Sequence, residues 1–193
     1  MSKTLKIAVA YHSGYGHTEA IAKSVAKGAE QGGAEVALVS VADLDELNWD
    51  TLNEADAIIF GSPTYMGSVS GQFKTFMDAS SKVWFEQGWK DKLAAGFTVS
   101  ASQSGDKLNT LVQMSIYAAQ QGMIWAGTGM MPGNNSAAGS VEDQNRLGSF
   151  LGLMAQANAD EGADVTPPAT DHRTAEAFGQ RIAEATERWQ KPE

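Results

Sequence analysis

The chain has 193 residues, which suits one large domain with a sizeable core, and we expect a single domain over residues 1–193. Its net charge of −9, with only 14 lysines and arginines, argues against a nucleic-acid-binding surface. The absence of cysteine excludes disulfides, thiol catalysis and iron–sulfur or zinc-thiolate sites.

Apolar runs alternate with helical stripes in the first part of the chain. Strands are expected at residues 5–11, 34–41 and 55–61, and their nearly continuous apolar character is typical of parallel strands covered on both faces. A helix is expected from Thr18, and Gly32 with Gly33 ends it. The apolar stripe of this helix comprises Ile21, Val25 and Ala29.

The alternation continues to the C-terminus. A helix around Phe73 and Phe76 precedes a fourth strand at residues 92–100, and a fifth strand is expected at 123–127. Five strands alternating with helices predict a three-layer α/β fold with right-handed crossovers. Two further helices are expected from apolar stripes, one formed by Leu108, Leu111, Val112, Ile116 and Ala119, the other by Phe178, Ile182, Ala185 and Trp189.

A long segment at about residues 128–170 does not fit the alternation. A short helix is expected at about residues 145–157, although Gly148 and Gly152 weaken it. A connection of this length is usually functional or disordered. The segment leaves the fifth strand at the edge where the first loop leaves the first strand. It therefore forms either a rim over a bound ligand or a surface excursion.

No targeting or membrane segment is apparent. The apolar run at residues 7–10 is too short for the hydrophobic part of a signal peptide, and nothing approaches the roughly 20 apolar residues of a membrane span. We expect a cytoplasmic protein without a membrane span. No metal-ligand spacing is apparent either.

Residues 9–20 predict a strand, a glycine-rich turn and a helix, an arrangement that suits a phosphate group. The first N–H groups of a helix lack internal partners, and the helix dipole adds positive potential there. Gly14 and Gly16 let the backbone approach a ligand closely. Hydroxyl donors are available from Ser13, Tyr15 and Thr18.

The residues of this turn distinguish between three kinds of phosphate loop. A Walker loop needs a lysine where His17 stands, and a dinucleotide fingerprint needs a glycine where Glu19 stands. A loop without lysine or arginine suits a single terminal phosphate, as in a mononucleotide site at a reversal of strand order. The alternative is an ordinary strand-to-helix turn in which Ser13 or His17 only caps the helix.

Two further loops should meet the first at the carboxyl edge of the sheet. In the loop after the third strand, Pro63 is expected to stop the strand, and Gly67 permits a tight turn. Small and polar residues form the loop after the fourth strand. A flat ring between two such loops would find backbone hydrogen bonds at its edge and an aromatic or apolar platform on its face. The candidate residues are Pro63, Thr64, Tyr65, Met66 and Gly67 in one loop and Ser100, Ala101, Ser102, Gln103, Ser104 and Gly105 in the other.

In these segments the chain resembles flavodoxin-fold NAD(P)H:quinone oxidoreductases of the tryptophan-repressor-binding-protein-like and NADPH-dependent FMN reductase group. The resemblance runs from the first strand to about Gly127, and its most specific parts are residues 11–18 and 61–67. Residues 70–76, Trp84 and residues 92–95 continue it. The resemblance implies a flavodoxin-like three-layer sandwich whose five parallel strands have the order 2-1-3-4-5.

The resemblance also implies non-covalent FMN as cofactor, NADH or NADPH as electron donor and a quinone as acceptor. Ser13–Thr18 would surround the phosphate, Pro63–Gly67 would follow the isoalloxazine ring, and Ser100–Gly105 would close the third side. No catalytic side chain is assigned, because the flavin carries the chemistry. Pocket candidates are Tyr15, Tyr65 and Trp84. A homodimer or homotetramer is also implied.

The chain departs from the family pattern at two positions. Residues 100–105 replace a threonine–glycine run and are one residue longer. Gln120 and Gln121 stand where the family tends to have a histidine. Two other functions remain open: a flavodoxin-type carrier of single electrons, mildly favoured by the acidity of the chain, and a regulatory flavoprotein.

Overall fold

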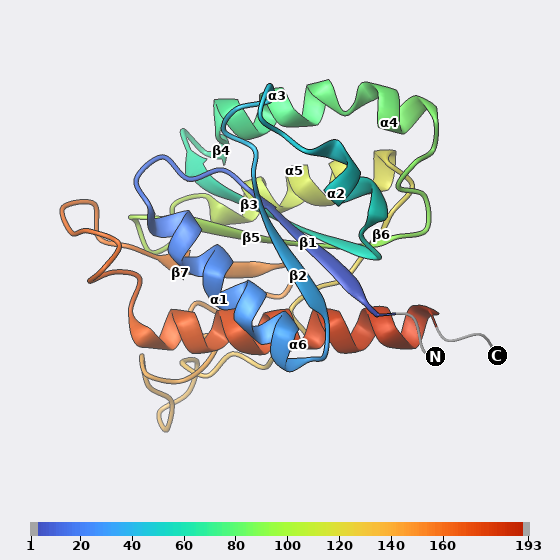
Figure 1. The fold of residues 1–193 in the computed structure, drawn as a ribbon. Coiled ribbons are helices and arrows are strands. Elements are labelled where there is room, and N and C mark those ends of the chain that lie inside the picture. Colours follow the sequence, from blue (N-terminus) through green and yellow to red (C-terminus); the bar gives the residue numbers. More distant parts are fainter. Residues whose placement is uncertain (1–3, 191–193) are drawn as a thin grey trace.

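The computed structural model describes residues 4–190. A twisted sheet lies between two layers of helices (Figure 1), and its five main parallel strands follow the order β2-β1-β3-β5-β6. This is the expected order 2-1-3-4-5, shifted in number because β4 is a short hairpin strand. The strands are β1 (Lys6–Tyr11), β2 (Glu35–Ser40), β3 (Ala57–Tyr65), β4 (Ser68–Val69), β5 (Leu93–Ser100), β6 (Ile124–Trp125) and β7 (Leu153–Gln156).

The helices form one layer on each face of the sheet. Below the sheet in Figure 1 lie α1 (His17–Gln31) and α6 (Ala169–Gln190), which close a core over β1, β3 and β5. Gly28 of α1 meets the backbone of α6 so closely that a Cβ atom there would overlap the Glu176 carbonyl. On the other face lie α2 (Trp49–Glu54), α3 (Gly71–Ala79), α4 (Ser81–Phe85) and α5 (Lys107–Gln120).

The buried face of α5 differs from the predicted stripe. Leu108 and Ile116 are exposed, whereas Met114 and Tyr117 join Leu111 in the core. The aliphatic residues alone suggested the wrong rotation of the helix. Met114 and Tyr117 cover the sheet instead, and Tyr117 packs against Phe60 and Trp89.

The edge of the sheet beyond β5 is filled by two segments. The expected fifth strand is only the two residues of β6, which pair with Leu93 and Ala94 at the start of β5. The chain then leaves the sheet and returns as β7, which pairs with residues 97–100 at the end of β5. The helix expected at residues 145–157 is therefore wrong. A Cβ atom on Gly152 would overlap the Gly96 carbonyl. Glycine at this position therefore lets β7 pair with the sheet.

Between residues 4 and 190, the structure contains no helix that is both long enough and apolar enough to cross a membrane.

Candidate functional site

A cavity of about 570 Å³ opens at the carboxyl ends of β1, β3 and β5. Its volume lies within the range of about 300–1,000 Å³ usual for cofactor and ligand sites. The three predicted loops form its walls, and a segment after β7 adds a fourth. The lining residues are Tyr15, His17, Thr18, Pro63, Thr64, Tyr65, Val99, Ser100, Ala101, Ala157, Ala159 and Glu161.

The first loop is held by Ser13 and leaves N–H groups of the first helical turn free. The Ser13 hydroxyl accepts hydrogen bonds from the N–H groups of Gly16 and Glu19, at 3.1 and 3.2 Å. Gly16 has φ +88°, a left-handed conformation that favours glycine. Within residues 4–190, the N–H groups of His17 and Thr18 have no hydrogen-bond partner. The start of α1 therefore presents unpaired donors and the positive end of the helix dipole.

Tyr65 connects the first two loops. Its hydroxyl accepts a hydrogen bond from the Gly14 backbone, and a Cβ atom on Gly14 would overlap this hydroxyl. The rings of Tyr15 and Tyr65 meet edge to face, with centroids 6.2 Å apart. Burial raises the pKa of Tyr65, so its phenol stays neutral at pH 7. Tyr15, by contrast, is 79% exposed, and the two tyrosines together give the cavity an aromatic wall.

Pro63 does not end the third strand as predicted, because β3 continues to Tyr65. β1 pairs with β3 only as far as Gly61, and β5 alone pairs with β3 at Pro63. With one flank of the strand vacant, a proline is tolerated there. The register of β3 on β5 thus carries Pro63 and Thr64 to the wall of the cavity.

Met66 and Gly67 form the tight turn between β3 and β4. Both have positive φ, +49° and +76°, as in the type I′ turns that suit two-residue hairpins. The Met66 side chain is fully exposed, and the Asn109 side-chain amide donates a hydrogen bond to the Gly67 carbonyl at 2.6 Å. The Thr64 hydroxyl is hydrogen-bonded to the hydroxyls of Thr98 and Thr110, each at 2.8 Å, so it is already engaged within the protein.

Side chains from two other elements hold the third loop. The Lys107 ammonium, from the first turn of α5, donates to the Ser100 hydroxyl at 2.8 Å and to the carbonyls of Ser102 and Gln103 at 2.8 and 2.9 Å. On the opposite side, the Gln156 side chain of β7 donates to the Ala101 carbonyl at 3.2 Å.

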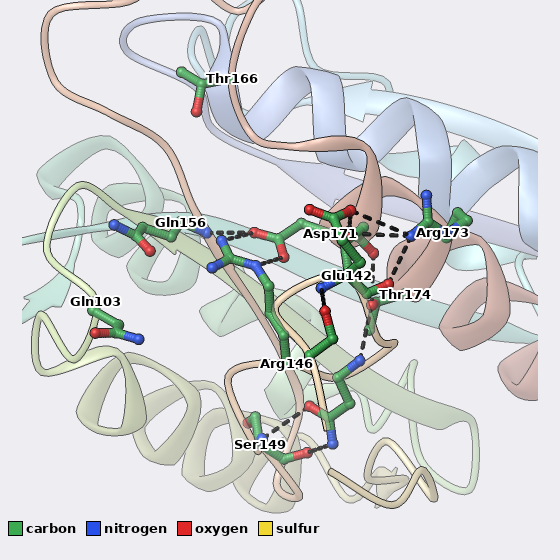
Figure 2. A network of polar contacts seen from close by, with 12 residues as sticks. Gln103, Glu142, Arg146, Ser149, Gln156, Thr166, Asp171, Arg173 and Thr174 are labelled. Atoms are coloured by element: carbon green, nitrogen blue, oxygen red, sulfur yellow. Dashed lines mark hydrogen bonds and ion pairs between the residues drawn. The ribbon is translucent and has the colours of Figure 1, made fainter. Parts of the chain in front are cut away.

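A buried ion pair fixes β7 behind this loop. The Arg146 guanidinium donates to both carboxylate oxygens of Asp171, at 2.7 and 3.0 Å (Figure 2). Asp171 also accepts the backbone N–H of Gln156 at 2.9 Å. Arg146 belongs to the long segment, Gln156 to β7 and Asp171 to α6. The pair therefore ties three distant parts of the chain together beside the third loop.

Of the two alternatives left open for residues 128–170, a rim or a surface excursion, the segment after β7 forms a rim. Ala157, Ala159 and Glu161 line the cavity. The His17 ring bonds the Glu161 carbonyl at 2.9 Å, which joins the rim to the first loop. His17 thus links two loops as well as beginning α1.

Eight of the predicted residues line the cavity, while others shape the loops behind it. Ser13, Gly14 and Gly16 form the first loop, Met66 and Gly67 the turn of the second, and residues 102–105 the outer part of the third. Trp84 is not brought to the cavity: it belongs to α4 and lines a separate hollow of about 440 Å³ between α3 and α5. Within this chain, Trp84 therefore does not lie in the substrate pocket where we expected it.

Sequence reasoning missed Val99, Lys107 and Gln156. Lys107 carries a usable signal, because a lysine in the first turn of a helix opposes the helix dipole. Gln156 carries none, because its role depends on β7 pairing with β5.

Residues 6–137 match the family of NADPH-dependent FMN reductases. The chain belongs to this family. Membership makes it an FMN-dependent oxidoreductase that uses reduced nicotinamide, as the resemblance implied.

The similarity to individual relatives extends over nearly the whole chain. Flavodoxin FldP of Pseudomonas aeruginosa is 43% identical over 178 residues, which cover 92% of this chain and 95% of that protein. An NAD(P)H dehydrogenase (quinone) of Archaeoglobus fulgidus is 32% identical over 205 residues, covering 95% and 98%. The crystal structure of a WrbA-like flavodoxin from Agrobacterium tumefaciens superposes with a TM-score of 0.76 at 38% identity, covering 97% of this chain and all of that one. The flavodoxin-like fold is thereby confirmed.

The geometry of the cavity itself suits FMN. The free N–H groups at the start of α1 match a phosphate, and the left-handed Gly16 brings the backbone close to it. One continuous cavity extends from the first loop to the walls formed by β3 and β5. The chain therefore offers a polar end for the phosphate and an apolar and aromatic end for a flat ring.

Proposed function

We propose that the protein reduces quinones by two electrons, with NADH or NADPH as electron donor. Bound FMN supplies the electron-transfer chemistry. The chain binds the flavin, orients it and shapes the space in which the donor and acceptor rings stack. The proposal is supported by the family and by relatives named NAD(P)H dehydrogenase (quinone).

One structural observation carries the proposal: the cavity has a fourth wall. Residues 157–161 extend the cavity beyond the three flavin loops, and His17 fastens this rim to the first loop. A carrier that only exchanges electrons with protein partners needs an exposed flavin edge, whereas a reductase needs an enclosed space for a second ring. Tyr15 and Tyr65 give that space an aromatic face.

The loop residues have separate roles in this proposal. The N–H groups around Ser13–Thr18 hold the phosphate of FMN, Pro63–Gly67 follow one edge of the ring, and Ser100–Gly105 close the remaining side. Because Thr64 is bonded to Thr98 and Thr110, it contributes through its backbone.

Steady-state kinetics test the reaction. One open ring face admits nicotinamide and quinone only in turn, and hydride transfer needs reacting atoms about 3–3.5 Å apart. Double-reciprocal plots with a benzoquinone acceptor should therefore be parallel at several fixed quinone concentrations. The FMN-loaded protein should also lose its visible absorbance anaerobically with NADH or NADPH alone, and the faster donor is the preferred one. No bleaching by either nicotinamide would contradict the proposal.

An electron carrier is the second candidate, because the relative with 43% identity is named a flavodoxin. A reductive titration separates the two functions. Two resolved one-electron steps in the visible spectrum indicate the carrier, and a single two-electron step indicates the reductase.

We also infer a homodimer or homotetramer. Trp84, Phe85 and Ile116 are exposed around α4 and α5 (Trp84 43%, Phe85 81%, Ile116 62%), and association would cover such apolar side chains. Light scattering should give the mass of two or four chains. A monomer at micromolar concentration would contradict the inference.

A further inference from the structure

Lys107 is a buried lysine whose charged end is used entirely by the third loop. Lys107 is only 1% exposed, although it lies in the first turn of α5 next to exposed loop residues. The ammonium has three protons, and its three hydrogen-bond partners, Ser100, Ser102 and Gln103, all belong to the loop. The geometry therefore leaves no donor of this ammonium unused.

These contacts set the direction of the loop's peptide groups. In a trans peptide the C=O and the following N–H point in opposite directions. Because the carbonyls of Ser102 and Gln103 point to Lys107, the N–H groups of Gln103 and Ser104 point away from it. Neither N–H donates a hydrogen bond to another residue in the described part of the chain. Lys107 thus turns two free donors outward from the loop.

The position of Lys107 is costly for the fold. A cation at a helix N-terminus opposes the helix dipole, and α5 has no side-chain cap to offset it. The pKa of Lys107 is lowered to about 8, mainly by burial; Asp171 opposes this shift, and Arg146 adds a smaller lowering. Arg146 belongs to the long segment and Asp171 to α6, so these are the charged groups that face Lys107 from the neighbouring elements. A costly cation held in this way points to a function in the site.

We propose that Lys107 is a positioning residue for the flavin: it holds the loop at residues 100–105 with two N–H groups outward, and it places a positive charge behind that loop. This rests on the role of the third loop given above. The pyrimidine edge of a flavin carries hydrogen-bond acceptors, and reduction adds negative charge to the flavin. Outward N–H donors and a buried cation therefore favour reduced FMN over oxidised FMN.

The test compares two lysine-to-methionine variants. Lys107→Met removes the ammonium behind the third loop. The control, Lys92→Met, removes an ammonium that also donates to two backbone carbonyls, those of Leu52 and Asn53, but lies at the opposite end of β5. Both variants lose one charge and similar contacts, so a general structural effect would appear in both.

The readouts are the affinities of apoprotein for oxidised and reduced FMN. Lys107→Met removes the contacts that hold the two N–H groups outward, so the affinity for oxidised FMN should fall about tenfold. The affinity for reduced FMN should fall by a further factor of about ten, which lowers the two-electron potential of the bound flavin by about 30 mV. Lys92→Met should keep the wild-type affinities and potential. A Lys107→Met protein that equals wild type, or losses that are equal in the two variants, would overturn the proposal.

A second measurement does not depend on the variant folding. In wild type, FMN affinity should fall between pH 7.5 and 9.5 as Lys107 loses its proton. An affinity that does not change over this range would overturn the proposal. These readouts involve no quinone turnover, so a failure of the proposed reaction would leave them interpretable, and their failure would leave the reaction standing.

Discussion

The first and third loops stand at the same cavity but are built in different ways. In the first loop, Gly16, the Ser13 hydroxyl and the start of α1 lie within a few residues of one another. The third loop is held by Lys107 from α5 and by Gln156 from β7, and β7 depends in turn on Asp171 and Arg146. In the proposed arrangement, local backbone geometry recognises the phosphate, whereas the loop that meets the ring edge must be positioned by distant elements.

The strongest test of the first loop compares a ligand that has the phosphate with one that lacks it. Apoprotein should bind FMN at least about 100-fold more tightly than riboflavin, because riboflavin lacks the group that meets the free N–H donors and the helix dipole. Fluorescence titration with both ligands measures the ratio. Equal affinities would remove the phosphate assignment.

Gly16→Val should break the first loop. Gly16 has φ +88°, and a Cβ atom there would stand 3.2 Å from the Ala163 Cβ of the rim. We expect FMN affinity to fall by about 30-fold, since a β-branched residue is strained in this conformation. Gly33→Val is the matched control. Gly33 has φ +89° but open space around it beyond the other end of α1, so its variant should lose stability and keep FMN affinity. Similar FMN affinities in the two variants would show that the effect is not local to the phosphate.

Gly67→Pro tests the second loop, which is intermediate between the other two. The turn is local, but Asn109 of α5 also holds the Gly67 carbonyl. Proline removes the N–H and cannot adopt φ +76°, so FMN affinity should fall about tenfold, or the flavin potential should shift. If the variant has the FMN affinity and the flavin potential of the parent protein, this turn does not contact the flavin.

The smallest expected effect concerns the pH dependence of stability. The pKa of Lys107 is about 8 in the folded protein and near 10.5 when unfolded, so above pH 8 the unfolded state binds more protons. Wild-type apoprotein should therefore gain stability relative to Lys107→Met as pH rises from 8 to 10.5, by about 1 kcal/mol between pH 8 and 9. Urea unfolding of both proteins at each pH measures this. A difference independent of pH would mean that Lys107 does not change its charge there.

The same contrast explains what could be predicted from the sequence. The strands of the main sheet and the first loop follow from apolar runs and from glycines beside a helix start, which are local signals. The order of the strands came from the family resemblance. The residues 153–156 are too few to indicate a strand, and their pairing with β5 comes from far along the chain. The buried face of α5 was misjudged because Met114 and Tyr117, not the aliphatic Leu108 and Ile116, face the sheet. Pro63 was misjudged because its tolerance depends on where β1 ends.

The division of the sheet edge between β6 and β7 has a consequence for the order of folding. β6 reaches β5 after one helical crossover, but β7 must first close the loop formed by residues 126–152 and needs Asp171 of α6 to hold it. Closing a longer loop costs more chain entropy, and distant pairings form late. A chain emerging from the ribosome would thus have its phosphate loop and β3 turn well before its rim and the Gln156 support of its third loop. Tight capture of FMN would then wait for the last quarter of the polypeptide.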